Sequence, residues 1–117
     1  ARDMMPRLLG KTTRETDPEI EATIWRLIKQ QSPIAIRSAI HRMMHRQDST
    51  PLLAQVSVPA LVITGEEDEM IPVEESRRIA DGIPGASLVI IPRAGHLANV
   101  EQPEAFNAAV HAFLKTL

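Results

Sequence analysis

Apolar residues in the first half of the chain recur at helical spacing. Between Asp17 and Gln31 an apolar residue stands at every third or fourth position, which is the period of one helix face. These residues are Ile20, Ile24, Leu27 and Ile28. Asp17 can cap the helix, and Pro18 fits its first turn because no hydrogen bond is lost there. The pattern predicts an amphipathic helix over residues 17–31.

The next segment repeats this arrangement. Ser32 provides a cap, Pro33 begins a helix, and an apolar stripe continues to about His45. The stripe consists of Ile36, Ile40, Met43 and Met44. We expect this second helix to pack against the first one. A short helix is also predicted over residues 3–10, with Gly10 at its end.

The pattern changes after Pro51 to two continuous apolar runs. Residues 60–64 and 87–91 are rich in β-branched side chains and are bounded by proline and glycine, which is typical of parallel strands buried on both faces. Residues 73–82 can form the helix that connects them. Strand, helix and strand then make a right-handed β-α-β unit.

The last segment begins after Pro103 and carries one more apolar stripe, which predicts a helix that covers the sheet. The stripe consists of Phe106, Val110, Phe113, Leu114 and Leu117. No internal repeat or low-complexity tract interrupts the chain. The sequence therefore predicts an α/β fold with a helical region over residues 1–50 and an α/β region over residues 51–117.

Polar, turn-rich loops follow both predicted strands. Asp68 lies in the loop after the first strand, and His96 lies in the loop after the second. Parallel strands end at the same edge of a sheet, so these two side chains are expected to lie close together. A carboxylate beside a histidine accepts the proton of Nδ1 and orients the ring for general-base catalysis. Asp48 is a poorer candidate for the acid because it precedes the first strand.

Composition and charge narrow the possible partners. The formal net charge is −2, with a sequence pI near 6.1, which gives no electrostatic reason to expect nucleic acid or a membrane surface as a partner. The absence of cysteine excludes disulfides, thiolate metal sites and a cysteine nucleophile. His41 and His45 have a zinc-ligand spacing, but Arg42 replaces the glutamate of a His-Glu-x-x-His motif. We expect no metal ion and no organic cofactor.

The sequence also bears on localisation. No apolar run approaches the roughly 20 residues that a membrane-spanning helix needs, and the N-terminus lacks the layout of a signal peptide. A cytoplasmic protein is therefore expected. The chain begins at Ala1, which fits a processed chain or a piece of a longer one.

An ordered set of motifs after Pro51 resembles the C-terminal portion of the α/β-hydrolase superfamily. The motifs are VPALVITGEED (58–68), IP (71–72), IPGA (83–86), GH (95–96) and EQPEAF (101–106). Within the superfamily, residues 51–117 are most similar to the esterase and 3-oxoadipate enol-lactonase-like branch. The resemblance implies a C-terminal part of that fold, and it implies that the helices before Pro51 belong to the cap of such an enzyme.

By this resemblance, Asp68 occupies the position of the acid in a catalytic triad, and His96 occupies that of the histidine. Weaker candidates for lining an acyl or ring pocket are Met4, Met5, Trp25, Met43, Met44, Met70 and Leu97. Methionine and tryptophan more often fill a core than a pocket, since methionine adapts to irregular gaps.

The nucleophile of the triad is not recognisable in this chain. No serine lies in a Gly-x-Ser-x-Gly turn. The sequence thus predicts the acid-base part of a serine hydrolase for small esters or lactones, inactive in isolation. One alternative is a non-catalytic module that binds a second copy, or the missing N-terminal part, through exposed sheet edges. Another is haloalkane- or haloperoxidase-like activity of the parent fold.

Overall fold

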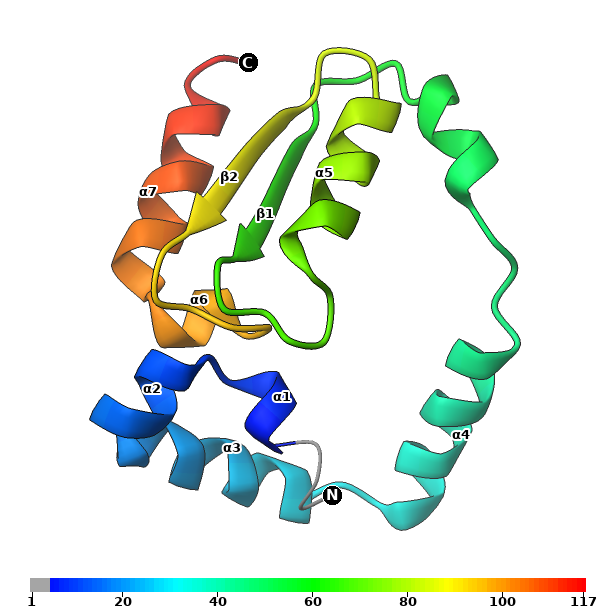
Figure 1. Cartoon of the computed structure of the whole chain (residues 1–117). Helices are drawn as coiled ribbons and strands as arrows, with labels where there is room; N and C mark the ends of the chain where they lie inside the picture. Colours follow the sequence, from blue (N-terminus) through cyan, green and yellow to red (C-terminus); the bar gives the residue numbers. More distant parts are fainter. Residues whose placement is uncertain (1–4) are drawn as a thin grey trace.

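The structure is a computed structural model, which describes residues 5–117. Met4 lies outside the described residues, as does the side chain of Met5, so their predicted pocket role is not addressed. Figure 1 shows the elements in chain order: α1 (Met5–Leu8), α2 (Lys11–Thr16), α3 (Pro18–Lys29), α4 (Pro33–Met44), the 3₁₀ helix η1 (Thr50–Gln55), β1 (Leu61–Gly65), α5 (Val73–Gly82), β2 (Ser87–Ile91), α6 (Ala98–Glu101) and α7 (Pro103–Leu114).

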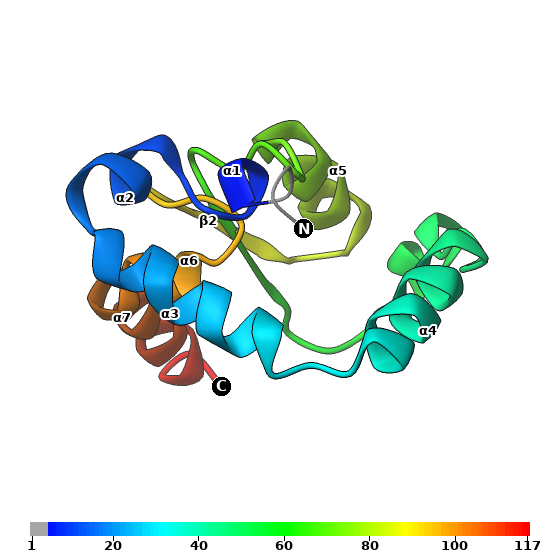
Figure 2. The ribbon, with the colours of Figure 1, turned by 90° about the horizontal axis from the view of Figure 1, so that it is seen from below.

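A parallel two-stranded sheet with a helix on each face organises the second half of the chain. β1 pairs with β2 in a register that runs from Leu61 opposite Ser87 to Gly65 opposite Ile91. α5 connects the strands, and Figure 2 shows α5 and α7 on opposite faces of the sheet. The predicted β-α-β unit is confirmed. Burial on both faces is only partial, because Ile90 of β2 remains 37% exposed.

The caps of α3 and α4 form as their sequences predict. The side chain of Asp17 accepts a hydrogen bond from the N–H of Ile20 at 3.3 Å, and Ser32 Oγ accepts one from the N–H of Ile34 at 3.2 Å. Each cap satisfies a backbone donor that the first helical turn leaves without a partner. The two helices therefore begin at the prolines that follow these caps.

The expectation that α4 packs against α3 is wrong. Every residue of α4 is exposed, and Met43 and Met44 are exposed by 69% and 76%. Figure 1 shows α4 apart from the strands, joined to α3 and η1 by connecting segments. An apolar stripe on a helix shows which face is suited to burial. It does not show which other element buries that face. No part of residues 5–117 covers this stripe.

The N-terminal segment is two helices instead of the single one predicted. α1 ends at Leu8, and Gly10 then precedes α2 with a φ of −59°, so it is not a left-handed helix end. α2 has the sequence KTTRET, which contains no apolar stripe, and this explains why periodicity does not predict it. A glycine is required at position 10 because the backbone there lies in close contact with another backbone segment.

Two small clusters of buried residues hold these parts together. Leu9 and Ile24 form one cluster with partly buried neighbours from α3 and from the segment after His96. Ile91, Ala94 and Ala98 form the other, on which Phe106 of α7 packs. The N-terminal helices thus pack on the histidine loop and α6. Phe106, Val110 and Phe113 of the predicted stripe of α7 are partly buried, whereas Leu114 and Leu117 stay exposed.

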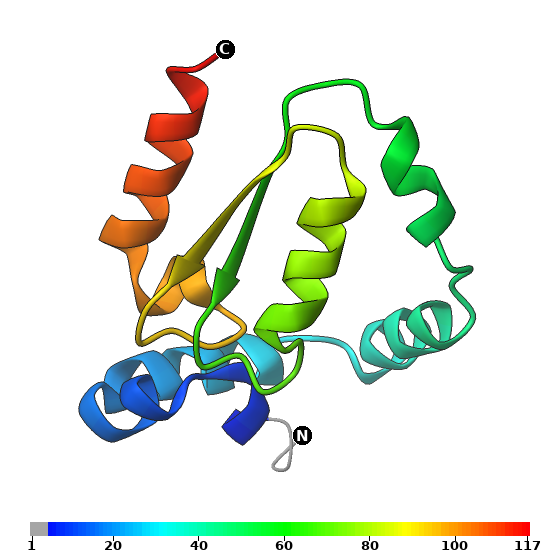
Figure 3. The same cartoon turned by 45° about the horizontal axis from the view of Figure 1, so that its top comes forward.

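Three glycines from three separate segments meet near the ends of the strands. Figure 3 shows the N-terminal helices below the loops that follow β1 and β2 in this region. A Cβ on Gly10 would lie 2.8 Å from the backbone nitrogen of Gly95. One on Gly95 would overlap the backbone of Leu9 and Gly10, and one on Gly65 would overlap the carbonyl oxygens of Ala94 and Gly95. Only glycine allows the backbones to approach this closely. We call this contact of Gly10, Gly65 and Gly95 the glycine junction.

Within residues 5–117, no helix is both long and apolar enough to cross a membrane.

The glycine junction predicts a large difference between two Gly→Ala substitutions. Gly95→Ala should lower the free energy of unfolding by about 3 kcal/mol, because backbone atoms would have to separate. Gly85→Ala should lower it by about 1 kcal/mol, because Gly85 has a φ of +72° with open space around it. Urea denaturation of the two variants tests this. Equal losses would contradict a close backbone contact at Gly95.

Candidate active site

The two loops that follow the strands leave the sheet hydrogen-bonded to each other. The N–H of Glu66 donates to the carbonyl of Ile91 at 2.9 Å, and the N–H of Glu67 donates to the carbonyl of Ala94 at 2.8 Å. The parallel pairing therefore continues past the last strand residues. This continuation places the next residue, Asp68, beside the loop that carries His96.

Asp68 and His96 are in direct contact. His96 Nδ1 lies 2.9 Å from Asp68 Oδ2. An ionised carboxylate can only accept a hydrogen bond, so Nδ1 carries the proton and donates it. The side chain of Asp68 is 6% exposed and that of His96 is 34% exposed. The acid is therefore shielded from water, whereas the imidazole still reaches the surface.

A tight turn holds the carboxylate of Asp68 in place. Its Oδ1 accepts hydrogen bonds from the N–H groups of Met70 and Ile71, both at 2.8 Å. The two oxygens thus have separate tasks: Oδ1 closes the loop and Oδ2 orients His96. An aspartate that bonds its own backbone two and three residues on is a common turn device. In this loop the turn fixes the direction of the second oxygen.

A small cavity of about 180 Å³ opens beside this pair. Its lining comes from the two loops and from β1, α5, α6 and α7, and it consists of Ile63, Thr64, Gly65, Asp68, Ile71, Ser76, His96, Ala98, Asn99 and Phe106. Within the described part of the chain, Nε2 of His96 has no hydrogen-bond partner. A ring nitrogen without a partner, on a histidine that lines a cavity, is available to exchange a proton with a bound group.

The weaker pocket candidates do not gather around this cavity. Leu97 packs on the cluster of Leu9 and Ile24, so it belongs to the core. Met43 lines a separate hollow beside η1, and Met44 lies exposed on the same helix. Met70 contributes its backbone N–H to the turn at Asp68, with a partly buried side chain that does not line the cavity. None of these four residues lines the cavity beside the Asp–His pair, and their place in an acyl or ring pocket stays a prediction.

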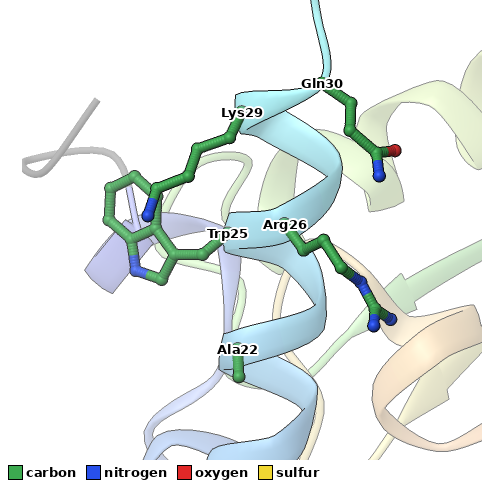
Figure 4. A pocket seen from close by; sticks show the side chains of 5 residues that line it. All are labelled: Ala22, Trp25, Arg26, Lys29 and Gln30. Atoms are coloured by element: carbon green, nitrogen blue, oxygen red, sulfur yellow. The ribbon is translucent and has the colours of Figure 1, made fainter.

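Trp25 lies at a wider surface hollow of about 730 Å³ along α3. Figure 4 shows its lining side chains, which are Ala22, Trp25, Arg26, Lys29 and Gln30. The side chains of Trp25 and Lys29 lie on one side of the helix, and Arg26 and Gln30 point to the other. The indole also packs on the cluster of Leu9 and Ile24. Trp25 therefore contributes to the core and lines no part of the cavity at His96.

Two glutamates near the site are not singled out by the sequence. Glu101 is 6% exposed and accepts hydrogen bonds from residues on both sides of His96. Glu67 accepts from the N–H of Thr12 at 2.7 Å and from the hydroxyl of the same residue. In the sequence both resemble ordinary solvated acidic residues. Only the folded loops show that their oxygens face backbone donors.

Asp48, the weaker candidate for the acid, is engaged elsewhere. The hydroxyl of Thr50 at 2.6 Å, and then its N–H at 2.9 Å, lower the pKa of the Asp48 carboxyl by stabilising the charged form. Asp48 lines the hollow beside η1, together with residues that include Met43, Leu53 and Ile79. Asp48 therefore serves the turn before η1.

The described residues contain no cluster of three or more histidine, aspartate or glutamate side chains that could hold a metal ion. His41 and His45 lie on one face of α4 with their rings stacked at a centroid distance of 4.2 Å. Nδ1 of His45 lies 2.8 Å from the carbonyl oxygen of His41. A backbone contact therefore occupies one nitrogen of this histidine pair.

Comparison with known proteins identifies the family. The model of the "Alpha/beta hydrolase family" matches residues 2–109, which is most of the chain. The chain belongs to the α/β-hydrolase family. The predicted fold class and the predicted resemblance to the esterase and enol-lactonase branch are confirmed.

Three relatives of this α/β-hydrolase chain show where the similarity lies. A thermophilic esterase from Thermogutta terrifontis superposes with a TM-score of 0.95 at 37% identity, over 98% of this chain and 42% of that one. The enol-lactonase from Burkholderia xenovorans gives a TM-score of 0.89 at 28% identity, over 97% and 43%. The 3-oxoadipate enol-lactonase 2 of Acinetobacter baylyi is 34% identical over 86% of this chain and 37% of its own length. This α/β-hydrolase chain thus spans less than half the length of these relatives.

Asp68→Asn should reverse the tautomer of His96. The amide oxygen can keep the two backbone bonds that Oδ1 makes, so the turn is retained, but the amide NH₂ then faces Nδ1. Nδ1 must become the acceptor, and the proton moves to Nε2. The ¹⁵N chemical shifts of the imidazole distinguish the two tautomers. An Asp68→Asn variant that keeps the Nδ1–H tautomer would contradict the assignment of Nδ1 as the donor to this side chain.

Proposed function

We propose that this chain supplies the acid and the histidine of a catalytic triad in a hydrolase that acts on small ester or lactone bonds. The contact between His96 Nδ1 and Asp68 Oδ2 at 2.9 Å carries this proposal. Its support is the combination of a shielded carboxylate, a partly exposed imidazole and a cavity that both side chains line. A histidine that only stabilised a loop would need neither the cavity nor a free Nε2.

In the proposed mechanism the two nitrogens of His96 have different tasks. Nε2 takes the proton of an attacking hydroxyl, while Nδ1–H remains bonded to Asp68. The ring becomes an imidazolium, and the carboxylate of Asp68 stabilises its positive charge. His96 then returns the proton to the leaving alcohol, or to the ring-opened oxygen of a lactone. The acid keeps its negative charge throughout.

We further propose that the nucleophile comes from outside these 117 residues. Ser76 lines the cavity, but it lies within α5 and is 7% exposed, whereas a serine nucleophile of this class is presented on a sharp turn after a strand. The relatives are more than twice as long as the part that matches. A further segment of the protein would then also supply the oxyanion hole.

The further segment that supplies the nucleophile would also cover the exposed apolar side of α4. Residues 1–50 would serve as a cap region, as the resemblance implies, and the exposed apolar residues Ile34, Ile40, Met43 and Met44 would face the rest of the enzyme. Support comes from the close superposition on the esterase, which includes nearly all of this chain within a longer one. A second copy of the chain is the alternative partner for this surface.

A cytoplasmic location also stays a prediction.

The choice of ester or lactone substrates rests on the relatives. The similar proteins include an esterase and two enol-lactonases. Both reactions begin with attack on a carbonyl carbon next to an oxygen, so one acid-base pair serves either substrate. Haloalkane- or haloperoxidase-like activity stays a prediction that no contact in the site favours.

Hydrolysis of p-nitrophenyl acetate tests the proposal in two steps. The 117-residue chain, His96→Ala and Ser76→Ala should all show the same background rate, because none has a nucleophile on a turn. A protein that joins this chain to its upstream coding sequence should hydrolyse the ester, and His96→Ala should lower its kcat by about 10⁶-fold. A rate in the isolated chain that Ser76→Ala abolishes would overturn the external nucleophile. A longer protein unaffected by His96→Ala would overturn the proposed role of His96.

A further inference from the structure

Glu101 is a buried carboxylate that the proposed mechanism does not use. It lies at the end of α6, five residues after His96, and is 6% exposed. Burying an ionised carboxylate is costly unless hydrogen bonds compensate it. The groups around the carboxylate of Glu101 therefore indicate the role of its negative charge.

The two oxygens of Glu101 bond two different parts of the molecule. Oε1 accepts from the N–H of Gly95 at 2.9 Å and from the N–H of Leu97 at 3.2 Å. Oε2 accepts from the N–H of Gly10 and from the hydroxyl of Thr13, both at 2.7 Å. All four partners are donors, so a group that only accepts is the one that fits. Hydrogen bonds to a charged acceptor are also stronger than neutral ones.

The bonds of Oε1 hold the backbone of His96 from both sides. Gly95 and Leu97 are its direct neighbours in the chain, so the Cα of His96 lies between two fixed peptide groups. The acid loop is tied to the same segment, through the bond from the N–H of Glu67 to the carbonyl of Ala94. The position of His96 relative to Asp68 is thereby set by Oε1 and by the pairing of the loops.

The bonds of Oε2 connect this arrangement to the N-terminal helices. Gly10 and Thr13 lie at the start of α2, and Gly10 touches Gly95 in the glycine junction. A displacement of α2 would remove both donors of Oε2, and the carboxylate could then turn away from Gly95 and Leu97. The carboxylate can therefore transmit the docking of α2 to the histidine loop.

We propose that Glu101 is a positioning residue for His96. It holds the imidazole in register with Asp68 through its bonds to Gly95 and Leu97, and it makes that register depend on the docking of α2. The importance of this register rests on the proposed function, whereas the positioning itself can be measured without any hydrolysis. Glu101 touches no reacting atom, so its effect must pass through His96.

The test uses the Nδ1 proton of His96 as a direct signal. In the ¹⁵N-histidine-labelled 117-residue chain, the proton shared with Asp68 should be visible by NMR and exchange slowly with water. Glu101→Leu removes both acceptor oxygens, so all four donors lose their partner. Exchange of the Nδ1 proton should then become faster by about tenfold or more. Far-UV circular dichroism checks that the variant is folded.

Thr13→Val is the matched control. It removes one donor to Oε2 and leaves both bonds of Oε1, with nearly the same side-chain volume, so the exchange rate should change by less than about threefold. Glu101→Asp is the second variant. It keeps the charge but is too short to reach both sides, and it should also accelerate the exchange.

The following outcomes would overturn the proposal. A folded Glu101→Leu variant with the wild-type exchange rate would show that His96 is held without Glu101. An equal acceleration in Thr13→Val would assign the effect to general loosening. Unfolding of both Glu101 variants would make Glu101 a support of the fold as a whole. If the longer protein shows no hydrolysis, the proposed function fails while the exchange rates remain informative, so the two failures are distinguishable.

Discussion

The glycine junction fixes the N-terminal segment against the end of β1 and the histidine loop. Gly10, Gly65 and Gly95 come from the N-terminal segment, the end of β1 and the histidine loop, and their backbones approach more closely than any side chain would allow. The contact leaves backbone donors buried, and a buried donor without a partner is costly. The carboxylate of Glu101 accepts from two of these glycines at once. The close backbone packing buries N–H groups, and the carboxylate that accepts their hydrogen bonds thus lies at the same place.

The acid-base pair follows from this junction and from the parallel sheet. The sheet brings the two loops out at one edge, and their mutual hydrogen bonds continue the pairing beyond the strands. Asp68 then turns one oxygen to its own backbone and the other to His96. The positions of both catalytic candidates are therefore set by the pairing of the two loops and by backbone N–H groups that donate to the carboxylates of Asp68 and Glu101. This suits a site whose geometry must be kept while the substrate side stays open.

The features that were predictable from the sequence are those encoded by local pattern. Asp17 and Ser32 cap the helices that their position before proline indicates, and the two β-branched runs pair in parallel as expected. The contact of Asp68 with His96 was predictable too. Parallel strands end at the same edge of a sheet, so the loops that follow them are neighbours. In these cases one short segment, or one topological rule, decides the outcome.

Other features depend on contacts between distant segments and could not be predicted in this way. Glu101 has the sequence surroundings of a surface residue, and its burial appears only when α2 lies over the histidine loop. Gly10 resembles a helix end, yet its role is close approach to Gly95. For α4, the apolar stripe of Ile36 and Ile40 predicts the helix correctly but not its neighbour.

Amide hydrogen exchange of Gly10, Gly95 and Leu97 measures whether the N-terminal helices and the histidine loop open as one unit. All three N–H groups donate to the same buried carboxylate, so they are expected to open together in one event. Their exchange rates in the 117-residue chain should correspond to the same opening free energy within about 0.5 kcal/mol. If Gly10 exchanges freely while Gly95 and Leu97 stay protected, the N-terminal helices are not coupled to the histidine loop, and the role assigned to the glycine junction is contradicted.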